Sequence, residues 1–125
     1  MQMSSMLLNP KLTGDIYSTS EVKTNKTWKN GKAIYRSYLT YNVQGSGTIS
    51  KTHNLNIEEV VKIEALCTIA GQTPSSHGYR PMPQVNASLQ YQFSINAITT
   101  NEISFLANGW DNNTAYLTLE YTKAN

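Results

Sequence analysis

The stretch that decides the fold is residues 17–37, which read YSTSEVKTNKTWKNGKAIYRS. Asn and Gly residues at 25, 30 and 31 tolerate positive φ, as tight turns between strands require. Turns at Thr24-Asn25 and at residues 30–32 would leave room only for a very short strand holding Trp28. We therefore expect Trp28 to be fixed to the surface of the sheet that contains residues 34–43. The segment has no catalytic group and indicates architecture.

The next part of the chain predicts three further elements. Residues 33–43 are rich in Tyr, Ile and Val and are expected to form a strand, which the Gly-Ser-Gly at 45–47 ends. Residues 48–53 would then form a second strand, paired with the first in a hairpin. Asn56 followed by Glu59 has the form of a capping box and predicts one helical turn. Apolar residues then alternate from Val61 to Ile69, which favours a strand over 60–70 rather than a helix.

The C-terminal half predicts a long loop followed by strands. Three prolines and two glycines make residues 71–84 a loop, and loops on compact domains often carry function. Apolar alternation predicts one bent strand or two short ones in 85–98 and single strands over 102–107 and 114–123, with a six-residue turn at 108–113. About six or seven strands with no long helix indicate an all-β fold, an antiparallel β-sandwich or jelly-roll-like single domain.

The chain resembles a known family. The residues that carry the main motif are Tyr17, Trp28, Gly31 and Tyr35. The family is a domain common at the C-terminal tips of bacteriophage tail-fibre and virion proteins, many of them from phages of Gram-positive hosts. Segments 53–58 and 115–123 are also similar to it, so the resemblance covers about residues 15–123. One departure is Asn25, where Gly is usual, and Asn tolerates the same left-handed conformation.

The resemblance implies a domain organisation, partners and a location. Residues 15–125 would form the knob, which the family implies to be a homotrimer, and residues 1–14 would form a leader that attaches to other virion proteins of the capsid or tail. The protein would be assembled in the host bacterial cytoplasm and located in the virion.

The composition of the chain suits a virion protein and argues against nucleic acid and membrane as partners. Charged residues make up only 14% of the chain and the net charge is +2, which gives no support for nucleic acid or membrane as a partner. The lysines at 23, 26, 29 and 32 are interpreted as a solvated turn region, with a phosphate-binding patch as the alternative. Cys67 is the only cysteine, and its apolar surroundings predict a buried hydrophobe rather than a nucleophile.

Catalytic and metal-binding patterns are scarce in the sequence. His53 and His77 are far apart and have no neighbouring ligand at zinc spacing, and no nucleophile-elbow or phosphate-binding motif occurs. Glycoside cleavage would need two carboxylates, such as Glu102 and Asp111, to meet across strands. We predict that the protein is not an enzyme and uses no cofactor or metal.

Carbohydrate binding is the function that the polar loops suggest. A planar aromatic beside polar groups suits a sugar ring, whose C–H face stacks while its hydroxyls take hydrogen bonds. The alternative is that these aromatics pack over the end of the sandwich or at a subunit contact. The expected function is a fibre knob that contacts cell-wall glycans during host adsorption; the alternative is a capsid or tail decoration protein without a ligand. The candidate glycan-binding residues are His77, Tyr79, Arg80, Trp110 and Asp111.

Overall fold

A computed structural model describes residues 21–88 and 90–125 of the chain, so Tyr17 and the predicted leader, residues 1–14, lie outside the described residues. This part of the chain forms nine strands and one short helix. In chain order they are β2 (Val22–Thr27), β3 (Ala33–Val43), β4 (Gly47–Thr52), β5 (Ile57–Thr68), α1 (Pro74–His77), β6 (Arg80–Pro81), β7 (Gln84–Val85), β8 (Gln92–Ile98), β9 (Glu102–Asn108) and β10 (Asn113–Lys123).

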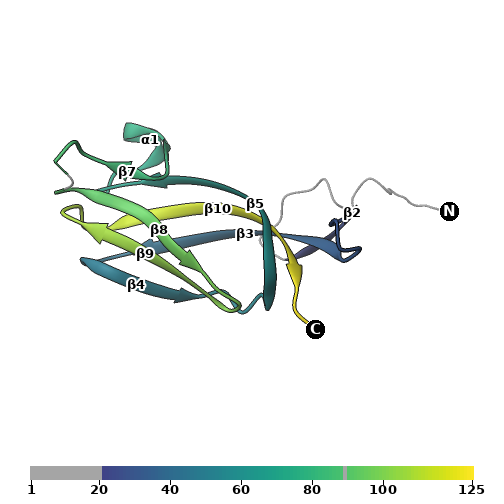
Figure 1. The fold of residues 1–125 in the computed structure, drawn as a ribbon. Helices are drawn as coiled ribbons and strands as arrows, with labels where there is room; N and C mark the ends of the chain where they lie inside the picture. Colours follow the sequence, from purple (N-terminus) through teal and green to yellow (C-terminus); the bar gives the residue numbers. More distant parts are fainter. Residues whose placement is uncertain (1–20, 89) are drawn as a thin grey trace.

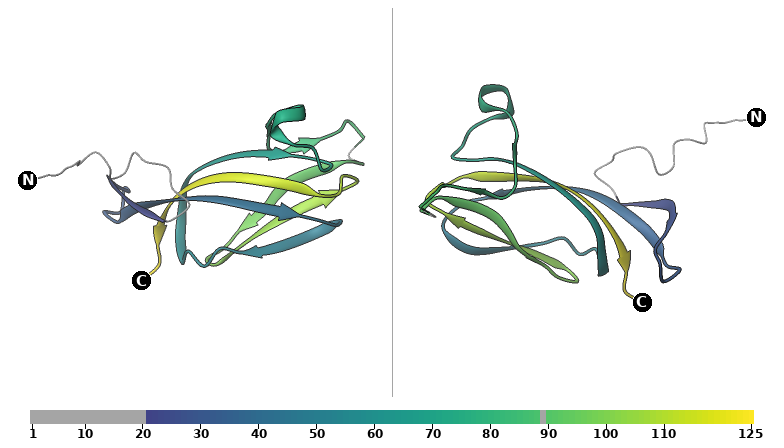
Figure 2. Two further views of the ribbon diagram at one scale, coloured as in Figure 1. Left: turned by 180° about the vertical axis from the view of Figure 1, so that it is seen from behind. Right: turned by 45° about the horizontal axis from the view of Figure 1, so that its top comes forward.

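The strands form two sheets that face each other, with β10 near the middle of the larger one (Figure 1). The five-stranded sheet has the order β2-β3-β10-β5-β6, and the four-stranded sheet has the order β4-β9-β8-β7. Every strand pairing is antiparallel. The prediction of an all-β, sandwich-like fold is therefore confirmed, and Figure 2 shows the two layers from behind and from above.

The core lies between the sheets and follows the alternation predicted for the last strand. Ala115, Leu117, Leu119 and Tyr121 of β10 are all fully buried, because period two turns these positions to one face. Phe105 of β9 and Phe93 of β8 stack from the opposite sheet, with ring centroids 5.6 Å apart. Cys67 is also fully buried, as predicted, and burial raises the pKa of its thiol to about 11.

The region around Trp28 forms an arm over the outer face of the five-stranded sheet. The Trp28 indole donates to the Glu59 carboxylate of β5 at 3.2 Å, and Lys26 of β2 pairs with Glu120 of β10 at 3.3 Å. Since β3 and β10 lie between β2 and β5, these contacts require the arm to cross the sheet. Trp28 is thus fixed to the sheet of β3, as the sequence predicted. Under the arm, Arg36 and Glu120 are buried.

The turn predicted at Thr24-Asn25 is wrong, whereas the turn at 30–32 is confirmed. Thr24 and Asn25 lie inside β2, where the pairing with β3 is irregular between Lys23 and Thr27. The Thr24 hydroxyl donates to the Ile34 carbonyl at 2.7 Å, which holds β2 to β3. Gly31 adopts φ +83° in the second turn.

The hairpin predicted between residues 33–43 and 48–53 is wrong. Both segments are strands, but β4 pairs with β9 in the other sheet, with Ile49 opposite Phe105. Residues 44–46 carry the chain from one sheet to the other. The Asp111 carboxylate accepts from the Gly45 amide at 2.7 Å and holds this crossing in place.

The helical turn predicted at Asn56 is also wrong. Asn54 and Asn56 both adopt φ +57°, a conformation that Asn tolerates and that a helix excludes. The strand therefore begins at Ile57, three residues earlier than predicted, and ends at Thr68.

The segment predicted as a loop, residues 71–84, contains more structure than expected: it holds α1, β6 and the beginning of β7. Residues 85–98, predicted as one bent strand or two short ones, contain the end of β7 and the separate strand β8. Asn86 closes the intervening turn, because its side chain accepts from the Tyr91 amide at 2.9 Å. Residues 102–108 form β9 with Ile103 and Phe105 buried, as predicted.

Candidate functional site

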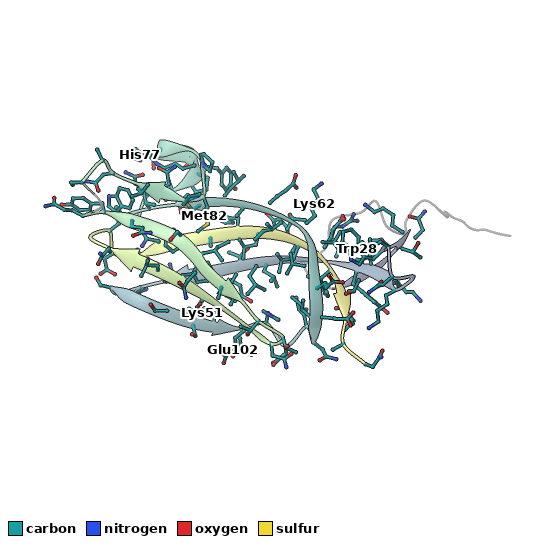
Figure 3. All side chains as sticks on the ribbon, viewed as in Figure 1. Trp28, Lys51, Lys62, His77, Met82 and Glu102 are labelled. Atoms are coloured by element: carbon teal, nitrogen blue, oxygen red, sulfur yellow. The ribbon has the colours of Figure 1, made fainter. Side chains whose placement is uncertain are left out.

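The two loops expected to carry the site lie at the same end of the sandwich. The Gly71 amide donates to the Asn112 carbonyl at 2.8 Å, and the Ala70 amide donates to the Asn113 side chain at 3.1 Å. Figure 3 shows His77 at this end, with α1, and Trp28 at the opposite end. The two loops named as the candidate site therefore lie together, and the question becomes which side chains they expose.

Trp110 is half-buried and packs against the core instead of standing out from the turn. It packs against the main hydrophobic cluster between the sheets, and its ring lies 5.6 Å from the ring of Tyr91. The chain turns sharply before it at Gly109, where φ is +76°. A methyl group added there would lie 2.4 Å from a Tyr91 ring carbon and 2.6 Å from the Gln90 carbonyl oxygen. This close approach requires glycine at position 109.

The Asp111 carboxylate binds backbone amides. Its carboxylate accepts from the amides of Gly45 at 2.7 Å and Asn112 at 2.9 Å. These two hydrogen bonds stabilise the charged form and lower the pKa of the Asp111 carboxyl. The residue therefore fastens the β9–β10 turn to the connection between β3 and β4.

Tyr79 is the candidate residue that the structure leaves open to solvent as an aromatic surface. Its side chain is 54% exposed, and its ring meets the ring of Tyr116 edge-to-face at 5.1 Å and 84°. Tyr116 lies on the outer face of β10, because its neighbours Ala115 and Leu117 point into the core. This pair stands on the outer surface of the five-stranded sheet.

The outer surface around the pair is partly apolar, and the nearest charged residues on this face of β5 are Glu64 and Lys62, which pair with each other. In the strand register Tyr116 lies opposite Thr40 on one side and Leu66 on the other, and Leu66 lies opposite Pro81. Leu66 is itself exposed. We call this surface the aromatic platform, defined by Thr40, Leu66, Tyr79, Pro81 and Tyr116.

His77 and Arg80 are not part of the aromatic platform. His77 is exposed in α1 and contacts the Ser76 hydroxyl at 2.9 Å. Arg80 is opposite Cys67, whose side chain points inward, so alternation directs Arg80 away from the face of Tyr79. Its Nε atom is buried without a hydrogen-bond partner among the described residues. The five predicted residues therefore belong to one end of the molecule but not to one site.

The prediction missed Tyr116, Leu66 and Pro81. Tyr116 and Leu66 lie at outward-facing positions of strands whose inward-facing residues form the core. An aromatic or apolar residue at an outward-facing position of a strand is a signal that can be read from the sequence. Neither was noticed, because which strand neighbours Tyr79 depends on the pairing of β10, β5 and β6.

The carboxylate pair considered for glycoside cleavage is not assembled. Glu102 begins β9 and Asp111 follows its end, and six steps of strand rise by about 20 Å, beyond the separation of up to ~9.5 Å that glycosidases use. Within residues 21–88 and 90–125, no three His, Cys, Asp or Glu side chains are grouped to hold a metal ion. No helix in the same part of the chain is long and apolar enough to cross a membrane.

The comparisons with known proteins assign no relative. No protein-family model matches the chain, and neither a curated protein nor a solved structure matches it. The fold and surface together define an all-β domain with an exposed aromatic platform on one sheet.

Proposed function

We propose that this protein is a non-enzymatic virion structural protein, a fibre knob that binds bacterial cell-wall carbohydrate through the aromatic platform. The observation that carries the binding part is the exposed Tyr79 ring set edge-to-face on Tyr116. The fibre-knob part is supported by the motif around Trp28, Gly31 and Tyr35, which resembles that of phage fibre tips. The protein would act in the virion, as a homotrimer.

The chemistry of the platform suits a neutral sugar. The C–H face of a pyranose ring stacks on an aromatic ring, and the fixed edge-to-face contact with Tyr116 gives Tyr79 a defined orientation before the ligand arrives. Thr40 lies beside Tyr116 and Thr114 two residues before it on the same face, so hydroxyl donors and acceptors flank the rings. A pre-ordered ring reduces the entropy lost on binding.

The test is binding of the purified full chain to host cells and to extracted wall polymer. We expect saturable binding that Tyr79→Ala weakens by about tenfold, or ~1.4 kcal/mol, because the stacking surface is removed. The control is Tyr91→Ala, in the turn of the other sheet, where the ring is 41% exposed but also contacts Trp110. Circular dichroism therefore checks that this variant is folded before its binding is compared. Light scattering of the same sample gives the oligomer mass.

The possible results separate the two functions considered. Loss of binding in Tyr79→Ala alone supports the adsorption knob. Absence of binding by the folded wild-type protein overturns it in favour of a capsid or tail decoration protein. Equal loss in both variants contradicts the platform as the site.

A further inference from the structure

A third tyrosine lies on the outer face of the five-stranded sheet, outside the aromatic platform. Tyr38 of β3 is 37% exposed, and in the strand register it lies opposite Thr118 of β10. Its neighbours along β3 lie opposite Leu117 and Leu119, which are fully buried, so Tyr38 points away from the core. Thr118 and Tyr116 are two residues apart on β10, so Tyr38 and Tyr116 project from the same face.

The strand register sets three tyrosines in a diagonal row across this face. Measured along β10, Tyr38 is level with Thr118, and Tyr79 is level with Thr114 when the register of β6 is continued by one residue. Tyr116 lies between them. The rise from 118 to 114 and the spacings from β3 across β10 and β5 to β6 place the Cα atoms of Tyr38 and Tyr79 about 20 Å apart. We call the row of Tyr38, Tyr116 and Tyr79 the tyrosine track.

The arm and the helix limit the open part of the outer face on either side of the track. Beyond Tyr38, the next outward positions are Arg36 and Glu120, which are buried under the arm. Beyond Tyr79 the chain leads into α1, and Figure 2 shows α1 and β2 at opposite ends of this sheet. A long ligand on this face would therefore cross the strands diagonally, from the edge of β3 to the edge of β6.

The surface along the track is polar but has little net charge. Thr40, Thr114 and Thr118 lie at outward positions between the rings. The charged residues that border the track on β5, Lys62 and Glu64, pair with each other at 3.8 Å. Exposed rings beside hydroxyl groups suit the C–H faces and hydroxyls of sugars. A balanced surface charge suits an uncharged polymer better than an anionic one.

The shape of the surface indicates the length of the ligand. The two main hollows of the described residues are lined by other side chains, so the track lies on an open sheet face and not in a pocket. A pocket would select the end of a chain, whereas an open face accepts its interior. Because Tyr38 and Tyr79 are about 20 Å apart, one sugar ring cannot stack on both.

We propose that the ligand of this face is an extended, uncharged polysaccharide chain that stacks on Tyr38 as well as on Tyr79. Such a ligand presupposes the carbohydrate-binding function proposed above, and Tyr38 adds a second stacking position to it. Once one part of the chain is bound at Tyr79, the unit that reaches Tyr38 binds intramolecularly. Affinity should therefore rise with chain length until both rings are covered.

Fragments of extracted wall polymer, separated by size, test this length dependence by isothermal titration of the full chain. The wild-type protein should bind fragments that reach both rings at least tenfold more tightly than fragments of one or two sugar units. Tyr38→Ala should weaken binding of the long fragments about tenfold and leave binding of the short ones unchanged, because only the long fragments reach this ring. Tyr79→Ala should weaken binding of both.

Two control variants isolate the contribution of the Tyr38 ring. Tyr38→Phe keeps the ring and should keep the affinity, whereas Val85→Ala removes an exposed apolar side chain from the other sheet and should have no effect. Urea unfolding shows that each variant is folded. Unchanged affinity of Tyr38→Ala for long fragments overturns the second stacking position, and so does an equal loss for short and long fragments. Binding that weakens strongly in concentrated salt overturns the assignment of an uncharged polymer.

The same data separate failure of the track from failure of carbohydrate binding itself. If Tyr79→Ala weakens binding of the long fragments and Tyr38→Ala does not, the aromatic platform is retained and the track is rejected. If the folded wild-type protein binds no fragment of any length, both are rejected. The double variant Tyr38→Ala/Tyr79→Ala should lose the product of the two single effects, because distant sites contribute independently. A double variant no weaker than Tyr79→Ala overturns the track.

Discussion

Two aromatic pairs lie near the same end of the molecule and serve opposite purposes. Trp110 and Tyr91 close the end of the core between the sheets, whereas Tyr79 and Tyr116 stand on the outer surface of one sheet. Both pairs include a loop or turn residue beside polar neighbours, which is why Trp110 and Tyr79 looked equivalent in the sequence. The difference shows that the direction of a loop aromatic depends on which sheet face the adjoining strand presents.

The largest expected effect on stability comes from Trp110→Ala. Removing this ring leaves a cavity under the end of the sandwich and should lower the free energy of unfolding by about 3 kcal/mol. Tyr79→Ala, the matched control from the other pair, should change it by less than ~0.5 kcal/mol, because the ring is exposed. Urea unfolding of both variants measures this. If Trp110→Ala were as stable as wild type and lost wall-polymer binding, the assignment of the two pairs would have to be reversed.

An intermediate effect is expected from Gly109→Ala. The new methyl group would meet the Tyr91 ring and the Gln90 carbonyl in a backbone conformation with φ +76°, which should destabilise the protein by about 1–3 kcal/mol. The double variant Gly109→Ala/Tyr91→Ala should recover part of this loss, because the ring contact is relieved while the backbone contact persists. Thermal unfolding of the two single variants and the double variant gives a double-mutant cycle. Strictly additive losses of stability would contradict a contact between the new methyl group and the Tyr91 ring.

The smallest effect is expected from Asp111→Asn, and it should depend on pH. The amides of Gly45 and Asn112 lower the pKa of Asp111 in the folded state, so the carboxylate stabilises the fold at pH values above its unfolded pKa of ~3.9. This stabilisation is lost as pH falls through the lower folded value. The stability difference between wild type and variant should therefore be present at pH 7 and disappear in acid. Urea midpoints across pH 2–7 measure it, and a constant difference would contradict the charge as the cause.

Part of the candidate site was predictable because loop residues 71–84 and 108–113 are marked by local chemistry. Glycine, proline and asparagine identify the turns wherever they occur in the fold. The identity of the exposed aromatic was not predictable, because Tyr79 is exposed through the pairing of β6 with β5 and of β5 with β10, which joins residues far apart in the chain.

The sequence by itself determined that this is an all-β domain, that β9 and β10 bury alternate residues, and that Cys67 is an interior hydrophobe. These features follow from a period of two and from residue type, which are local properties. Only the tertiary structure decided that β4 leaves β3 to pair with β9, that Trp110 turns inward while Tyr79 turns outward, and that the residues of the tyrosine track, far apart in the chain, share one sheet face. The reason is physical: strand partners are chosen by the packing of distant side chains, such as Ile49 against Phe105, and no local pattern records that choice.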